Sequence, residues 1–141
     1  MTASAARAEQ RLVAAGIVFA VASTMHAVDH LRRGQGSITD SLYWLGNFGL
    51  VLQVATITLV LTRHRVAPIA ALATGSSLAV GFTAAHWLPE WGPISDPIWE
   101  VDTAVWFSIV AASSEILGAI VLAATALAVV RHRGLESFAA T

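Results

Sequence analysis

The sequence contains no cysteine, and only 12% of its 141 residues are charged. The absence of cysteine excludes disulfides, iron–sulfur clusters and thiolate metal sites. An average soluble domain has about 25% charged residues, and a soluble fold of this size could not cover its surface at half that density. Because 56% of the residues are hydrophobic, the composition indicates a protein of the lipid bilayer.

Lysine is also missing, and all eight basic residues are arginine. Together with the many alanine and valine residues, this usage is typical of a GC-rich bacterial genome. The formal net charge is −1, and the sequence has no basic tract. We therefore expect no nucleic-acid partner, because such binding depends on clustered positive charge.

Long apolar runs, separated by short polar connections, are what the sequence does contain. Each run is long enough to cross about 30 Å of hydrocarbon as a helix that rises about 1.5 Å per residue. The predicted spans are residues 12–31, 42–62, 68–88 and 103–130. They predict a single transmembrane domain, an all-α antiparallel four-helix bundle with up-down-up-down connections.

The arginines fall mostly on one side of this predicted bundle. Six of them lie near the two termini or in the turn after the second span: Arg7, Arg11, Arg63, Arg65, Arg131 and Arg133. The opposite side holds most of the carboxylates, namely Asp29, Asp40, Glu90, Asp96, Glu100 and Asp102. The positive-inside rule therefore predicts that both termini are cytoplasmic and that the protein is a multi-pass protein of the bacterial inner membrane.

All the tryptophans lie on the predicted outer side, at Trp44, Trp87, Trp91, Trp99 and Trp106. An interfacial aromatic belt normally occurs at both membrane surfaces, so this one-sidedness leaves a second interpretation, an aromatic lid over a pocket. The extracytoplasmic loop 89–102 carries two of these tryptophans and three prolines. Each proline fixes its φ angle, so we expect the loop to be rigid.

A polar segment closes the first predicted span and places two histidines and an aspartate close together. On a helix His26 and His30 are i,i+4 neighbours, and Asp29 lies three residues after His26, so all three point roughly one way. Neutral imidazole is a common ligand of zinc, copper and iron. The spacing predicts a metal site to which His86, near the end of the third span, adds a ligand. The alternative interpretation is an interfacial polar cap without a metal.

Glu115 lies twelve residues into the fourth predicted span, roughly 18 Å deep. A carboxylate at that depth must be protonated, paired or bound to a cation. We expect it to act as a ligand or in acid–base chemistry with His26. The alternative is a structural role, in which a protonated Glu115 bonds to Gln53 or to a serine.

Other residues lie at a depth that suits this predicted pocket. Asp29 has three interpretations: a ligand, an acceptor that fixes a histidine tautomer, or a partner of Arg32 or Arg33. The remaining predicted pocket residues are Asn47, Gln53, Trp87, Trp91 and Ser108. We expect His64 and His132, which each stand between two arginines, to be solvated.

Several functions are compatible with these residues. The leading hypothesis is a divalent transition metal (zinc, iron or copper) on His26, His30 and His86, with Glu115 or an outer-loop aspartate completing the shell. Such a metal could activate water for chemistry on a lipophilic small molecule. A second hypothesis is a b-type haem ligated by His86 and one histidine of the first span.

The other two hypotheses need no cofactor. A membrane enzyme could use Glu115 and His26 as acid and base on an isoprenoid- or sterol-like substrate. Alternatively, the chain could be an accessory subunit of a homo-oligomer or of a larger membrane complex, in which polar groups bond between subunits. The sequence leaves open whether the protein is an enzyme.

Overall fold

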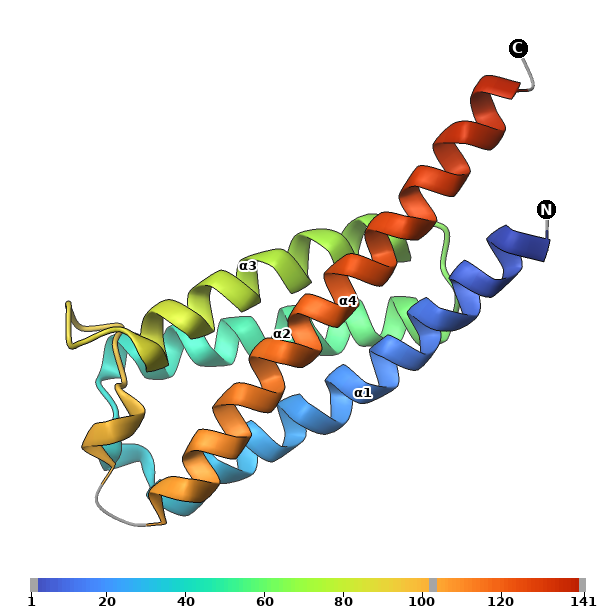
Figure 1. The fold of residues 1–141 in the computed structure, drawn as a ribbon. Helices are drawn as coiled ribbons and strands as arrows, with labels where there is room; N and C mark the ends of the chain where they lie inside the picture. The colour runs from blue at the N-terminus through green and yellow to red at the C-terminus, as the bar shows by residue number, and fades with distance from the viewer. Residues whose placement is uncertain (1–2, 102–103, 140–141) are drawn as a thin grey trace.

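The fold is known from a computed structural model, which describes residues 3–101 and 104–139. Its helices are α1 (Ala3–Arg33), α2 (Asp40–Leu61), α3 (Ala67–Trp87) and α4 (Val105–Ala139), with short 3-10 turns η1 (Gln35–Ser37) and η2 (Ile98–Glu100). The four long helices pack antiparallel to one another (Figure 1). The prediction of an all-α antiparallel four-helix packing is therefore confirmed.

All four helices are long and apolar enough to cross a membrane. α1 starts well before the first predicted span and α4 continues past the end of the fourth. The extra turns carry alanine, arginine and glutamate, which favour helix and tolerate water. The predicted start of the fourth span, Thr103, lies outside the described residues, and α4 begins at Val105.

Local signals end α1 and start α2 close to the polar segment. Gly34 adopts a left-handed φ of 83°, and its N–H donates to the His30 carbonyl at 3.0 Å, so α1 stops directly after Arg33. Thr39 caps α2 by accepting a hydrogen bond from the Leu42 N–H at 3.1 Å. The same hydroxyl donates to the Pro93 carbonyl, which fastens the loop after α3 to the start of α2.

Helix α4 packs closely against α1 and α3, whereas α2 packs less extensively against both (Figure 1). The core is built largely from small residues that let the backbones approach. A Cβ atom on Gly75 would lie 2.7 Å from the Ala119 carbonyl oxygen of α4, and one on Gly16 would lie 2.7 Å from the Val60 side chain of α2. Both positions therefore require glycine.

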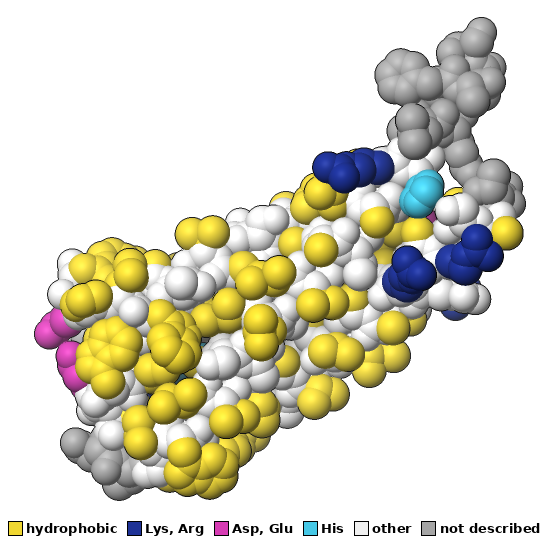
Figure 2. Space-filling view, in the orientation of Figure 1, with side chains coloured by type: hydrophobic (Ala, Val, Ile, Leu, Met, Phe, Trp, Pro, Cys, Tyr) yellow, Lys and Arg dark blue, Asp and Glu magenta, His cyan; other side chains and the backbone are white. Residues whose placement is uncertain are grey.

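The outer surface of the bundle is apolar over most of its length. Figure 2 shows hydrophobic side chains spread along the visible face and arginines gathered at one end. Phe48, Val51 and Val80 are each more than 60% exposed. Surface of this kind is unfavourable in water but meets acyl chains in a bilayer. By helix length and hydropathy, the chain is a multi-pass membrane protein.

Candidate metal centre

The end of α1 brings two imidazoles into contact. The Nε2 atoms of His26 and His30 lie 2.8 Å apart, and the ring centroids are 4.6 Å apart. His26 is buried and His30 is half-buried. The helical i,i+4 spacing therefore places both rings on one face, as the sequence predicts.

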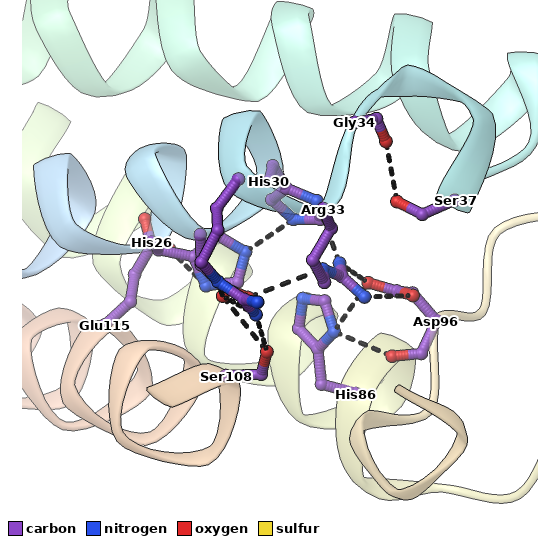
Figure 3. Close-up of polar contacts among 11 residues, drawn as sticks. His26, His30, Arg33, Gly34, Ser37, His86, Asp96, Ser108 and Glu115 are labelled. Carbon is purple, nitrogen blue, oxygen red and sulfur yellow. Dashed lines mark hydrogen bonds and ion pairs between the residues drawn. The ribbon is translucent and has the colours of Figure 1, made fainter. Parts of the chain in front are cut away.

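His86 reaches the same place from α3 (Figure 3). Its ring centroid lies 4.9 Å from that of His26 and 6.0 Å from that of His30. One ring nitrogen from each histidine can be chosen so that all three lie within 4.8 Å of one another. We call these residues the histidine triad. This buried three-histidine group could bind a metal ion.

The loop after α3 orients His86. The Nδ1 atom of His86 lies 2.9 Å from the carbonyl oxygen of Asp96, and the Asp96 N–H donates back to the Ala85 carbonyl at 2.8 Å. Since a carbonyl only accepts, Nδ1 carries the proton and Nε2 keeps its lone pair. Metal-binding histidines usually have one ring N–H held in this way.

Arg33 connects the loop to α1. Its guanidinium forms a two-pronged ion pair with the carboxylate of Asp96, with an Nη1–Oδ1 distance of 2.9 Å. Its Nη2 atom also lies 2.9 Å from Nδ1 of His30. Burial raises the pKa of Asp96, but the hydrogen bonds and charge of Arg33 lower it more, so the net pKa lies below its ordinary value. Asp96 is therefore a carboxylate that neutralises Arg33.

Asp29 is the second carboxylate of this network. It accepts a hydrogen bond from Arg32 at 2.8 Å and one from the Ser108 hydroxyl of α4 at 3.0 Å. Its other oxygen lies 3.4 Å from Nε of Arg33. Of the three roles considered for Asp29, the geometry corresponds to the ion pair with both arginines, and Ser108 joins α4 to it.

Glu115, on α4, lies next to the His26 ring of the triad. Its Oε2 atom lies 3.2 Å from Nδ1 of His26, and both side chains are buried. This contact does not meet the geometry of a hydrogen bond, and neither atom has a hydrogen-bond partner among the described residues. The side chains of Ser23 and Gln53 lie beside the same carboxylate. Gln53 therefore belongs to the floor of the site.

The hydrogen bonds assign a tautomer to His30 and His26. A guanidinium only donates, so Nδ1 of His30 accepts from Arg33. Neutral His30 then carries its proton on Nε2 and donates it to Nε2 of His26. His26 in turn carries its proton on Nδ1, the nitrogen that faces Glu115. A metal ion between the two Nε2 atoms would replace this bond.

Charge in the cluster does not balance. The carboxylates of Asp29 and Asp96 face the guanidiniums of Arg32 and Arg33, whereas the carboxylate of Glu115 faces the His26 imidazole. With neutral imidazoles and an ionised Glu115, one negative charge remains in a buried site, where an uncompensated charge is costly. One proton would balance the cluster, whereas a divalent ion would leave it with one positive charge.

Three of the predicted pocket residues stay away from the triad. Asn47 is exposed and donates to the Tyr43 carbonyl of its own helix at 2.8 Å. Trp87 and Trp91 are 41% and 51% exposed, and the indole N–H of Trp91 donates to the Ala84 carbonyl at 2.8 Å. Among the described residues, the ring contacts of the three imidazoles are with one another and with Phe82, and not with either tryptophan.

Several residues of the network, among them Arg33, Asp96 and Phe82, were not among the predicted pocket residues. Arg33 touches His30, Asp29 and Asp96 at once, and Phe82 stacks on His26 with 5.4 Å between ring centroids. Phe82 stands one turn before His86, on the same face of α3, and that spacing is the signal that could have found it. For Arg33 the signal is its i,i+4 spacing from Asp29.

A cavity of about 640 Å³ adjoins the triad on its outer side. Its lining includes Ser37, Thr39, Glu90 and Glu100, and also Arg33 and Asp96. The last two residues also contact His30 and His86 and thus connect the cavity lining to the triad. The cavity is polar and bears acidic side chains.

The fold and the site together define a class: a four-helix membrane protein with a buried histidine triad near one end of the bundle. Comparison with family models, with curated proteins and with solved structures found no match for this chain.

Proposed function

We propose that this protein binds a divalent transition metal ion between His26, His30 and His86. The observation that carries the proposal is the convergence of three imidazoles, from two helices, in a buried site with an excess carboxylate. Neutral imidazoles suit zinc, copper and iron.

Small adjustments suffice to form the site. Two nitrogens bound tetrahedrally to one zinc at about 2.1 Å lie about 3.4 Å apart. The Nε2 atoms of His26 and His30 are 2.8 Å apart and must separate slightly, and His86 must approach. His30 must also move its proton to Nδ1, which turns Arg33 away from that nitrogen and leaves it paired with Asp96 and Asp29.

Glu115 supports the ion without binding it. Its carboxylate faces the Nδ1 edge of His26, whereas the ion lies at the Nε2 edge. A carboxylate that accepts the distal N–H of a ligating histidine fixes the ring and strengthens the ligand, and Glu115 would take this role by turning to accept the Nδ1–H of His26. The protein then supplies three ligands and leaves a position open, as catalytic zinc sites do.

The outer cavity gives the ion a route to the triad. Glu90 and Glu100 line it and favour cations, and its lining also includes Arg33 and Asp96, which contact His30 and His86. By the positive-inside rule, this end of the bundle is extracytoplasmic and both termini are cytoplasmic. Metal-activated water chemistry on a lipophilic small molecule is the further use that we propose for the open position.

A haem fits the site less well than an ion. Axial imidazoles must stand on opposite faces of the macrocycle. The rings of His26 and His86 are 4.9 Å apart, and His30 touches His26 as well. A macrocycle between them would require α1 and α3 to separate. An absorbance spectrum of the purified protein, which shows an intense Soret band if haem is bound, tests this alternative.

Metal-free acid–base chemistry is the second candidate function. It is favoured by the chain of contacts from Arg33 through His30 and His26 to Glu115. Such a chain holds a proton at a defined atom next to a deep carboxylate, which is what general acid–base catalysis requires. Activity that persists in the presence of a strong chelator would favour this candidate over the metal centre.

Metal analysis of the protein purified in detergent tests the leading proposal. We expect about one transition metal ion per chain, and we expect the variants His26→Ala, His30→Ala and His86→Ala to lose it. His64→Ala is the matched control, because His64 is exposed in the turn between α2 and α3. A wild-type protein that takes up no zinc, copper or iron would refute the proposal, as would unchanged uptake in His86→Ala.

A further inference from the structure

A second cavity lies at the opposite end of the bundle, where both termini are found (Figure 1). It is a groove of about 250 Å³ between α1 and α4. Its walls include Arg7, Ala8 and Arg11 from α1 and Ala124, Ala128 and His132 from α4. The groove is open because the alanine side chains are small, and the basic side chains lie along its edges. We call it the basic groove.

The arginines of the basic groove have no carboxylate partner among the described residues. Glu9 is the acidic residue nearest to them in sequence, two positions from each, and it therefore points to the other side of α1. Arg133 binds Glu9 at 2.7 Å and also donates to the Arg65 carbonyl at 2.7 Å. Glu9 is thus already used, and no side chain that the structure describes supplies a carboxylate to Arg7 or Arg11.

The positions of these arginines favour an anion between them. Arg7 and Arg11 are i,i+4 neighbours, where like charges repel unless an anion joins them. Guanidinium groups match the geometry of phosphate oxygens with two hydrogen bonds each. The half-buried His132 adds a ring N–H from α4. Figure 2 shows arginine and histidine side chains together at this end of the molecule.

The surface beyond the groove is suited to acyl chains. Towards the middle of the bundle, Val18 continues the face of Arg11 and is 56% exposed. On α4, Val121 and Leu117 continue the face of Ala124 and are 46% and 61% exposed. A phosphate bound at the arginines would therefore have an apolar track directly below it, which a free phosphate does not use.

We propose that the basic groove binds the phosphate headgroup of an anionic phospholipid, with its acyl chains along Val18, Val121 and Leu117. Basic recesses between transmembrane helices are a recognised type of lipid site. This site is independent of the histidine triad, which lies at the other end of the bundle. The bound lipid would join α1 to α4 where the two helices diverge.

Native mass spectrometry of the detergent-solubilised protein tests this proposal. Phosphatidylglycerol and phosphatidylcholine with identical acyl chains are added in turn. We expect wild type to retain phosphatidylglycerol preferentially, and we expect the double variant Arg7→Gln/Arg11→Gln to lose about tenfold or more in retention. The matched control is Arg63→Gln/Arg65→Gln, which removes the same charge from the same end of the bundle, outside the groove.

A second variant changes shape without changing charge. Ala124 is exposed in the groove wall, so Ala124→Phe fills the groove while both arginines remain. We expect it to lose phosphatidylglycerol as well. Equal losses in the two arginine pairs would overturn the proposal in favour of diffuse surface charge. Unchanged retention in Ala124→Phe would overturn it too, and so would displacement of the lipid by millimolar inorganic phosphate.

Discussion

At one end of this bundle, charged side chains are buried and bonded to one another. At the other end, they are more exposed to solvent. Arg33 and Asp96 have side chains that are 6% and 8% exposed. At the end with the termini, the Arg133 and Glu9 side chains are 44% and 22% exposed. The same type of ion pair therefore exists in two environments within one small protein.

The difference matters because the energy required to form an ion pair depends on how far the pair is buried. Burying two charges requires a desolvation energy that pairing only partly returns. An exposed pair requires little and contributes little. A buried network around three imidazoles therefore supports the proposal that these residues hold a ligand. The exposed arginines are better explained by their position at a membrane surface.

Asp96→Asn should have the largest effect on the stability of the protein. The change leaves Arg33 buried with only the 3.4 Å contact to Asp29 as an ionic partner. We expect a loss of about 3 kcal/mol in the free energy of unfolding, measured by thermal or denaturant unfolding in detergent. A loss below about 1 kcal/mol is typical of surface ion pairs. It would contradict the claim that the buried pair contributes more to stability than the exposed pair.

His86→Ala should have the next largest effect, on the metal rather than on the fold. Removing one of three ligands should lower metal affinity about a hundredfold or more. Competition with a chromophoric chelator measures the affinity. His132→Ala, at the other end of the bundle, is the control and should bind metal as wild type does. Similar affinities in both variants would show that the ion binds elsewhere.

Glu115→Gln should raise the stability of the metal-free protein and lower its affinity for the metal. It removes the unbalanced buried charge, so the metal-free protein should unfold at a higher temperature than wild type. It also removes the carboxylate that faces His26, so metal affinity should fall about 10- to 100-fold. If affinity and stability fall together, Glu115 has a purely structural role.

Glu9→Gln should have the smallest effect. It deletes the partner of Arg133 in an exposed pair, so we expect a loss of less than about 1 kcal/mol in the free energy of unfolding. The measurement is the same unfolding experiment as for Asp96→Asn, under the same detergent and salt conditions. A loss as large as that of Asp96→Asn would remove the distinction between the two ends.

The sequence predicts those features that depend on position along a helix. Apolar run lengths predict the four helices, and the i,i+4 spacing predicts that His26 and His30 share a face. The depth of His86 in its run predicts that it reaches the same level. These inferences succeed because the rise and period of a helix are nearly constant.

Rotation of a helix about its axis is harder to predict than depth. Asn47 has a suitable depth, but α2 is apolar on nearly all sides, so nothing in its pattern marks the inward face. The result is that Asn47 is exposed while Gln53 is buried beside Glu115. Trp87 and Trp91 are similar cases, since an aromatic side chain suits both a lid and a membrane interface.

Loop contacts are the other feature that the sequence leaves open. Asp96 stands in a loop with several acidic residues, and only its placement in space distinguishes it from Glu90 and Glu100. In the fold it holds both Arg33 and His86. The helical pattern carries no information on which loop residue returns to the bundle.

X-ray absorption spectroscopy of the zinc-loaded protein tests the central claim most directly, because it counts and identifies the atoms around the ion. The account predicts three imidazole nitrogens at about 2.0–2.1 Å and one light-atom ligand in the remaining position. A shell made mainly of carboxylate or water oxygens, with one histidine or none, would contradict it.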